Sequence, residues 1–146
     1  MKIFLGSTIS LTALFSFFLI SLNSSAAPLE QWVRITTLKI DSKGNQGMYF
    51  VDKSSIETRG NRRSYWAGLI YTQPIKVKDK GRTLSVNKLV AFISINCRNK
   101  SDYQFYKVGV FAPNDKLLQT IDFKRGVLSL PAQGTKVTGN YVCSRK

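Results

Sequence analysis

Residues 64–73 are SYWAGLIYTQ, a stretch in which both sets of alternating positions hold apolar or aromatic side chains. Successive side chains of an extended strand point to opposite faces of a sheet. One face would therefore hold Tyr65, Ala67, Leu69 and Tyr71, and the other Trp66, Gly68 and Ile70. This pattern predicts a strand that is partly buried on both faces.

Short apolar runs separated by turn residues continue on either side of this stretch, and no window shows a sustained helical period. Turn signals such as Gly44-Asn45-Gln46-Gly47 and Arg59-Gly60-Asn61-Arg62 separate the runs. The expected strands are Gln31–Ile40, Met48–Asp52, Ser64–Gln73, Leu84–Cys97, Tyr103–Phe111 and Leu117–Phe123. The sequence therefore predicts a mainly β fold, a small antiparallel sheet of about six strands.

The tail from Gly126 to Lys146 has no strand pattern. Pro131, Gly134 and Gly139 are unfavourable in a long helix, so we expect at most one short helical turn, over residues 136–141. A C-terminal segment of this kind needs an anchor on the sheet.

The N-terminus has the features of a secretory signal peptide. Lys2 precedes the uncharged, mostly apolar run 3–22, and Ser24-Ser25-Ala26-Ala27 supplies the small residues that a signal peptidase recognises. We expect cleavage after Ala26 or Ala27. The alternative is an uncleaved membrane anchor, since the run is nearly long enough to span a bilayer.

Cleavage would divide the chain into a signal peptide, residues 1–26, and a single β-rich domain, residues 27–146, of a size that can bury a core. No cysteine lies near the cleavage site, which argues against a lipid-anchored N-terminus. The mature protein would have no transmembrane span. We expect it in the periplasm, on the cell surface or secreted.

Cys97 and Cys143 are the only cysteines of the chain. An even number of cysteines in an exported protein usually forms disulfides, so these two are expected to pair. A loop of this length closed by a disulfide should stabilise the fold by roughly 4 kcal/mol. The bond would tie the C-terminal segment to the end of a strand.

The formal net charge is +14, and the loss of Lys2 would lower it to +13. Such a charge favours anionic partners: an anionic glycan, a lipid head group or an acidic protein surface. Export makes cellular nucleic acid an unexpected partner. The densest cationic segment is PIKVKDKGR, residues 74–82, a polar connection that we expect to be an exposed loop. Lys76, Lys78 and Lys80 would share one side of it if the backbone is extended. Lys76, Lys78, Lys80 and Arg82 are the candidate contact. The alternative is a solvated loop that only keeps the protein soluble.

The chain has no histidine, which removes the commonest general base and metal ligand. The two cysteines are not a C-x-x-C pair, and we find no paired carboxylates, nucleophile elbow or phosphate loop. The sequence therefore predicts no enzyme, no metal site and no cofactor.

Aromatic residues lie close to cations in two of the expected strands. Such a mixture can bind glycans or nucleic acid, but aromatics at period two in strands are more often core or cross-strand pairs. The aromatics are Tyr65, Trp66, Tyr71, Tyr103, Phe105 and Tyr106, and the cations are Arg62, Arg63, Lys88, Arg98 and Lys107.

Several segments in order resemble the surface-adhesin protein E family of bacterial exported proteins. They are Tyr49-Phe50-Val51-Asp52, Ser55-Ile56, Gly60-Asn61, Arg63, Tyr65-Trp66, Ser85-Val86, Ile95-Asn96-Cys97, Tyr106 and Tyr141-Val142-Cys143. Within them, Asp52 and Ser55 suit a turn at a strand end, because their side chains readily bond nearby backbone amides.

The resemblance implies a small antiparallel sheet whose C-terminal segment is tied to a strand by a disulfide. It also implies a periplasmic or cell-surface binding role and, from the founding adhesin, a homodimer that engages host matrix proteins. The leading hypothesis is thus a non-enzymatic, adhesin-like binding module with a cationic face. The alternative is a structural or assembly component of the envelope that acts through sheet-edge pairing or dimerisation.

Overall fold

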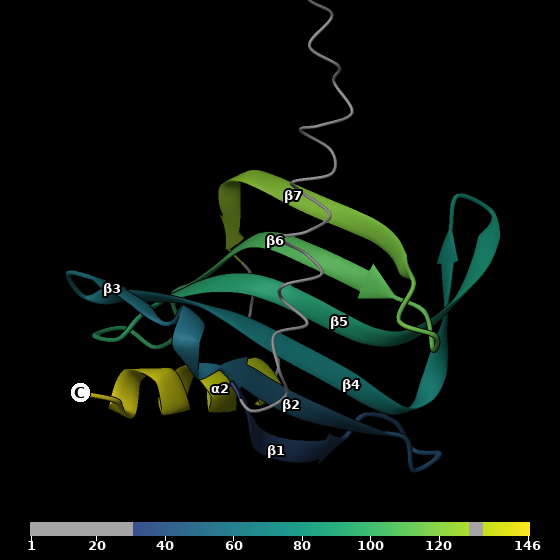
Figure 1. Ribbon diagram of the computed structural model, residues 1–146, viewed down its shortest axis with the longest axis horizontal. Coiled ribbons are helices and arrows are strands. Elements are labelled where there is room, and N and C mark those ends of the chain that lie inside the picture. Colours follow the sequence, from purple (N-terminus) through teal and green to yellow (C-terminus); the bar gives the residue numbers. More distant parts are fainter. Residues whose placement is uncertain (1–30, 129–132) are drawn as a thin grey trace, which may run out of the picture. The chain divides into compact units, whose positions relative to one another are not determined.

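The computed structural model describes residues 31–128 and 133–146 of the chain. Its main feature is an antiparallel sheet with the strand order β1-β2-β4-β5-β6-β7 (Figure 1). Strands that are adjacent in this order are paired by hydrogen bonds. The strands are β1 (Trp32–Lys39), β2 (Gln46–Asp52), β4 (Arg62–Asp79), β5 (Arg82–Asn96), β6 (Tyr103–Phe111) and β7 (Leu117–Leu128). The mainly β fold predicted from the alternating pattern is confirmed.

Three shorter elements complete the described part: the 3-10 helix η1 (Lys53–Ser55), the strand β3 (Glu57–Arg59), which pairs with the start of β4, and the helix α2 (Gln133–Ser144). None of the helices in residues 31–128 and 133–146 has the length and apolar character needed to cross a membrane. The expected signal peptide and its cleavage site lie outside the described residues.

The sheet has two faces of different character. The inner face packs against α2 and holds the core, which consists of Val51, Tyr65, Ile93, Ile95 and Tyr103 together with Val142 of the helix. The helix contacts β1, β2 and β4. Side chains at the intervening positions of the strands, Trp66 and Phe92 among them, point to the opposite face, which we call the outer face.

The turn after β2 is built by side chains that bond the backbone. Asp52 is buried and accepts from the Ser54 amide at 3.0 Å, which caps η1. The Ser55 hydroxyl donates to the Asp52 carbonyl and accepts from the Trp66 amide. The expected turn-forming role of Asp52 and Ser55 is thereby confirmed.

Two local expectations differ from the structure. Residues 74–82 are not a loop, because β4 and β5 continue through them as a hairpin. The helix is also longer than the single turn expected over residues 136–141. Its glycines at 134 and 139 weaken the intrinsic helix propensity, but they let the helix approach the sheet closely.

Candidate functional site

The cationic segment lies in a two-stranded hairpin arm, residues 75–86, which extends beyond the neighbouring strands. β2 pairs with β4 only as far as Tyr71, and β6 pairs with β5 only from Lys88 onward. Lys80 (φ 45°) and Gly81 (φ 78°) form the tip. Positive φ at both central residues is typical of a two-residue type I′ turn, which suits the twist of a hairpin. Figure 1 shows this arm at the right-hand end of β4 and β5.

The register of the arm separates its cations. Lys76 and Lys78 are two positions apart on β4 and share one face of the arm, opposite Ser85 and Thr83. Arg82 lies on the other face, directly across from Asp79. The arrangement of three lysines on one side, expected for an extended backbone, holds for Lys76 and Lys78 only, because Lys80 occupies the turn.

All four cationic residues of the arm, Lys76, Lys78, Lys80 and Arg82, are exposed. In the described part of the chain the ion pairs are formed by other residues, and none involves these four side chains. Asp79 is the one acid of the arm, so the arm has a formal charge of +3. Such a protrusion presents positive charge to both of its sides.

A disulfide joins Cys97, just after β5, to Cys143 near the end of α2. The Sγ atoms are 2.08 Å apart and the Cα atoms 5.4 Å apart. Arg63 of β4 also donates a hydrogen bond to the Val142 carbonyl, one of the orphan carbonyls at the helix end. The C-terminus of α2 is therefore fixed to the sheet by a covalent bond and a charged donor.

Three tyrosines of the inner face hold the body of the helix. The Tyr103 hydroxyl donates to the Thr135 carbonyl at 3.1 Å, and the Tyr65 hydroxyl lies 3.3 Å from Thr138 Oγ1. Gly134 lies so close to the ring of Tyr49 that a Cβ there would be 2.1 Å from it. Burial raises the pKa of Tyr103 to about 12 and raises the pKa of Tyr65 further. These phenols are therefore neutral at physiological pH.

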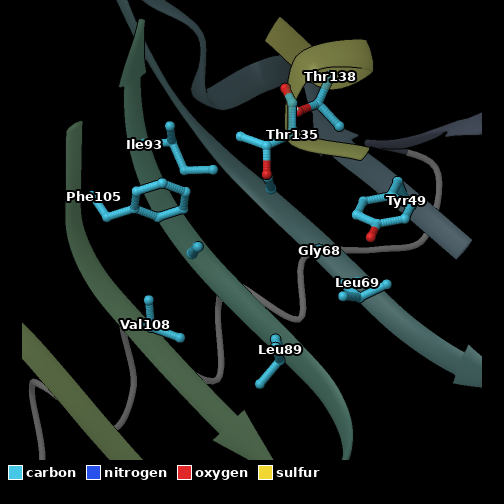
Figure 2. A pocket seen from close by; sticks show the side chains of 11 residues that line it. Tyr49, Gly68, Leu69, Leu89, Ile93, Phe105, Val108, Thr135 and Thr138 are labelled. Atoms are coloured by element: carbon cyan, nitrogen blue, oxygen red, sulfur yellow. The ribbon is translucent and has the colours of Figure 1, made fainter. Parts of the chain in front are cut away.

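A small open cavity of about 150 Å³ lies between the inner face and the start of α2. Figure 2 shows Thr135 and Thr138 of the helix at one end of it and apolar side chains of the sheet around the rest. Those side chains are Leu69, Leu89, Ile93, Phe105 and Val108, with Tyr49 beside the helix. The cavity can hold a small apolar group, and its lining supplies no acid, base or nucleophile.

This cavity was not predicted from the sequence, because its lining residues were expected only as strand positions. The alternation in residues 64–73 predicted that Leu69 would share a face with Tyr65, but neither the side that the helix covers nor the position of the helix was predictable from it. Among the described residues, no group of three or more His, Cys, Asp or Glu side chains could hold a metal ion.

The aromatic residues that the sequence placed near cations fall into two groups. Tyr65, Tyr71 and Tyr103 are buried, at 0%, 8% and 1% exposure, and Phe105 is half-buried against the core on the inner face. Trp66 and Tyr106 are half-buried on the outer face. The first group belongs to the interior, whereas the second is accessible.

Comparisons with known proteins identify a family and a similar solved structure. A family model described as surface-adhesin protein E matches residues 32–127. The structure of the selenomethionine form of Haemophilus influenzae protein E is similar at 13% sequence identity and a TM-score of 0.44, with 77% of this chain and 88% of that chain covered. A search of curated proteins finds no match.

Proposed function

Since the chain belongs to the surface-adhesin protein E family, we propose that it is an exported binding module of the cell envelope or surface that contacts anionic partners through its hairpin arm. Membership in this family points to a non-enzymatic, adhesin-like surface protein. The contact site that we propose is the hairpin arm, and the partner class is anionic molecules. It includes the division of the chain into a signal peptide, residues 1–26, and one domain, residues 27–146.

One observation carries the choice of contact site: the arm presents four exposed cations on a protruding hairpin. Elsewhere on the described sheet, Arg62, Lys88 and Lys107 each lie within 4 Å of an aspartate oxygen. A cation that already has a carboxylate partner adds little to the attraction of a second anion. The four cations of the arm form none of the ion pairs of the described residues, so they are available to an anionic partner in solution.

The partner class follows from this charge. Anionic glycans, lipid head groups and acidic protein surfaces all present negative groups that Lys76, Lys78, Lys80 and Arg82 can reach from the two faces and the tip of the arm. Binding of this kind is rapid at low ionic strength and weakens as salt screens the charges. A steep salt dependence is therefore its signature.

A second candidate function is assembly through sheet edges, as a structural component of the envelope or as a homodimer. β1 and β7 stand at the ends of the described sheet and each has an unpaired edge. Unpaired edges can accept a strand from another chain. Edge pairing uses backbone hydrogen bonds, so it should respond little to salt.

The experiment compares two variants of equal charge. The arm variant replaces Lys76, Lys78, Lys80 and Arg82 by serine. The charge-matched variant replaces four exposed cations outside the arm by serine: Lys43, Lys53, Arg98 and Lys100. Both should unfold within about 1 kcal/mol of the parent, because surface substitutions rarely cost more.

Binding to immobilised heparin and to phosphatidylglycerol vesicles is then measured at low and moderate salt. We expect the parent and the charge-matched variant to bind similarly and the arm variant to bind at least several-fold more weakly to one of the two probes. If the arm variant binds both probes as tightly as the parent does, the arm is not the contact. If neither probe binds in a salt-dependent way but the protein self-associates to the same degree at low and moderate salt, edge pairing is the better account.

A further inference from the structure

A row of aromatic side chains crosses the outer face of the sheet, with one ring from each of five adjacent strands. We call it the aromatic belt, and it consists of Trp32 (β1), Phe50 (β2), Trp66 (β4), Phe92 (β5) and Tyr106 (β6). All five are half-buried. Among the described elements, α2 packs on the inner face, on the side of the sheet opposite the belt.

The rings of the belt lie close enough to form a continuous surface. The ring centroids of Trp66 and Phe92 are 5.2 Å apart, and those of Phe92 and Tyr106 are 6.2 Å apart. On the other side of Trp66, Gly68 leaves room for Trp32 and Phe50. A Cβ on Gly68 would lie 3.3 Å from Trp32 Cζ3 and 3.7 Å from the Cβ of Phe50.

The position of Tyr106 depends on an irregularity in β6. The pairing of β5 with β6 shifts between Phe92 and Ile93, so that Phe92 pairs with Lys107 and Ile93 with Phe105. Tyr106 is the extra residue of this bulge, and bulges often re-aim a side chain. Its hydroxyl donates to Gln104 Oε1 at 2.6 Å, which places a polar pair at the end of the belt.

Three cations near the belt have carboxylate partners, whereas Arg34, which is exposed and pairs with Phe50 in the register, donates to Thr37 Oγ1. Arg62 Nη1 lies 2.6 Å from Asp102, and Lys88 Nζ lies 2.6 Å from Asp115. Lys107, which pairs with Phe92 in the register, lies 3.4 Å from Asp122. A protein that binds single-stranded nucleic acid combines stacking rings with a positive groove that follows the phosphates. Here aspartates offset the charge of three cations beside the belt, so the belt favours a neutral ligand over a polyanion.

We propose that the aromatic belt is a binding site for the pyranose rings of a neutral polysaccharide. The apolar face of a sugar ring packs on an aromatic ring, while polar groups beside the stack bond its hydroxyls. Trp66, Phe92 and Tyr106 supply the stacking surface at intervals comparable with one sugar unit, and Gln104 with the Tyr106 hydroxyl supplies the polar contact. This inference goes beyond the proposed function and does not depend on the hairpin arm.

The test titrates the purified protein with neutral hexasaccharides, namely cellohexaose, chitohexaose and maltohexaose, and follows tryptophan fluorescence and NMR amide shifts. We expect at least one of them to change the emission of the two tryptophans, with the same affinity at 50 mM and 500 mM NaCl. Trp66→Ala should weaken this binding about tenfold, in the range measured for loss of one stacking ring. Ile70→Ala, a half-buried site on the same strand and face, is the matched control and should leave it unchanged.

Trp66→Phe keeps a stacking ring and should retain most of the affinity, which separates loss of stacking from a folding defect in Trp66→Ala. The site is overturned if none of the hexasaccharides binds, or if the shifted amides lie outside the belt strands. Salt-sensitive binding of oligo(dT) without sugar binding would assign the belt to nucleic acid instead. If the tryptophan emission changes only when the protein self-associates, and not when a hexasaccharide is added, the belt would be assigned to contact with a second copy of the chain. These results leave the arm unaffected, since its probes are anionic and salt-sensitive.

Discussion

Replacement of Cys97 and Cys143 by serine removes the covalent link between the end of β5 and α2. The two residues are 46 positions apart. In the chain-entropy model, a closed loop of this length lowers the entropy of the unfolded chain by about 14 cal/mol/K, which corresponds to about 4 kcal/mol of stability at 25 °C. For a domain of this size the midpoint of thermal unfolding should then fall by roughly 16 °C.

The assay is urea unfolding followed by tryptophan fluorescence and far-UV circular dichroism. The parent in reductant is the control, because it keeps both sulfur side chains and loses only the bond. Parent in reductant and the double serine variant should both unfold about 4 kcal/mol more easily than the oxidised parent. The loop argument is wrong if the free energy of unfolding of either is within about 1 kcal/mol of that of the oxidised parent. In that case, residual contacts between the α2 segment and the strand segments would already restrict the unfolded chain without the disulfide.

The remaining predictions concern the helix contacts and export. Gly139→Ala should lower the free energy of unfolding by about 1–3 kcal/mol, because the new methyl group would lie 2.0 Å from the Tyr103 hydroxyl; an unchanged urea midpoint would contradict this packing. Burial raises the pKa of Tyr103 from 10.0 to about 12, so the unfolded state releases this proton first. The contribution of Tyr103 to the free energy of unfolding should be fully present below about pH 10 and fall as the pH rises towards 12. Tyr103→Phe should reduce this fall. A free energy of unfolding of the parent that stays constant between pH 10 and 12 would refute the prediction. The intact mass of the exported protein should match cleavage after Ala26 or Ala27, whereas a full-length chain in the membrane fraction would rule out cleavage.

The sequence predicted the sheet because its signal is local. Residues 64–73 hold apolar or aromatic side chains in both sets of alternating positions, and residues 89–93 are a short apolar run; short runs of this kind between turn signals indicate strands. The hairpin arm was missed although the same signal continues into it, with Ile75 and Val77 alternating with lysines. Lys80-Gly81 supplies the two positive φ values that a tight hairpin needs. The high charge of the segment led to the expectation of a loop.

The length of α2 was not predictable from propensity. Gly134 and Gly139 each weaken an isolated helix, but in the folded protein they are the positions where the helix meets the rings of Tyr49 and Tyr103. Tertiary packing therefore reverses the local preference. The packing depends on Tyr49 and Tyr103, which are about 85 and 36 positions away from these glycines, so the sequence of the tail alone does not predict it.

The candidate sites were predicted in part. The sequence identified the four cations but not their division between the faces and tip of the hairpin. The alternation placed Tyr65 and Trp66 on opposite faces, as the structure has them, but it did not specify which face α2 covers. The bulge that turns Tyr106 to the outer face depends on the pairing of β5 with β6, which single-strand patterns do not specify.

The most direct test of the proposed contact is an NMR titration of the ¹⁵N-labelled protein with a heparin hexasaccharide at low salt. If the arm binds anionic polymers, the largest amide shift changes should lie in residues 75–86, with smaller changes over the rest of the sheet. They should vanish in moderate salt and in the arm variant, and persist in the charge-matched variant. Largest changes outside the arm, for example in the loop at residues 97–101, with the arm amides unmoved, would contradict the account.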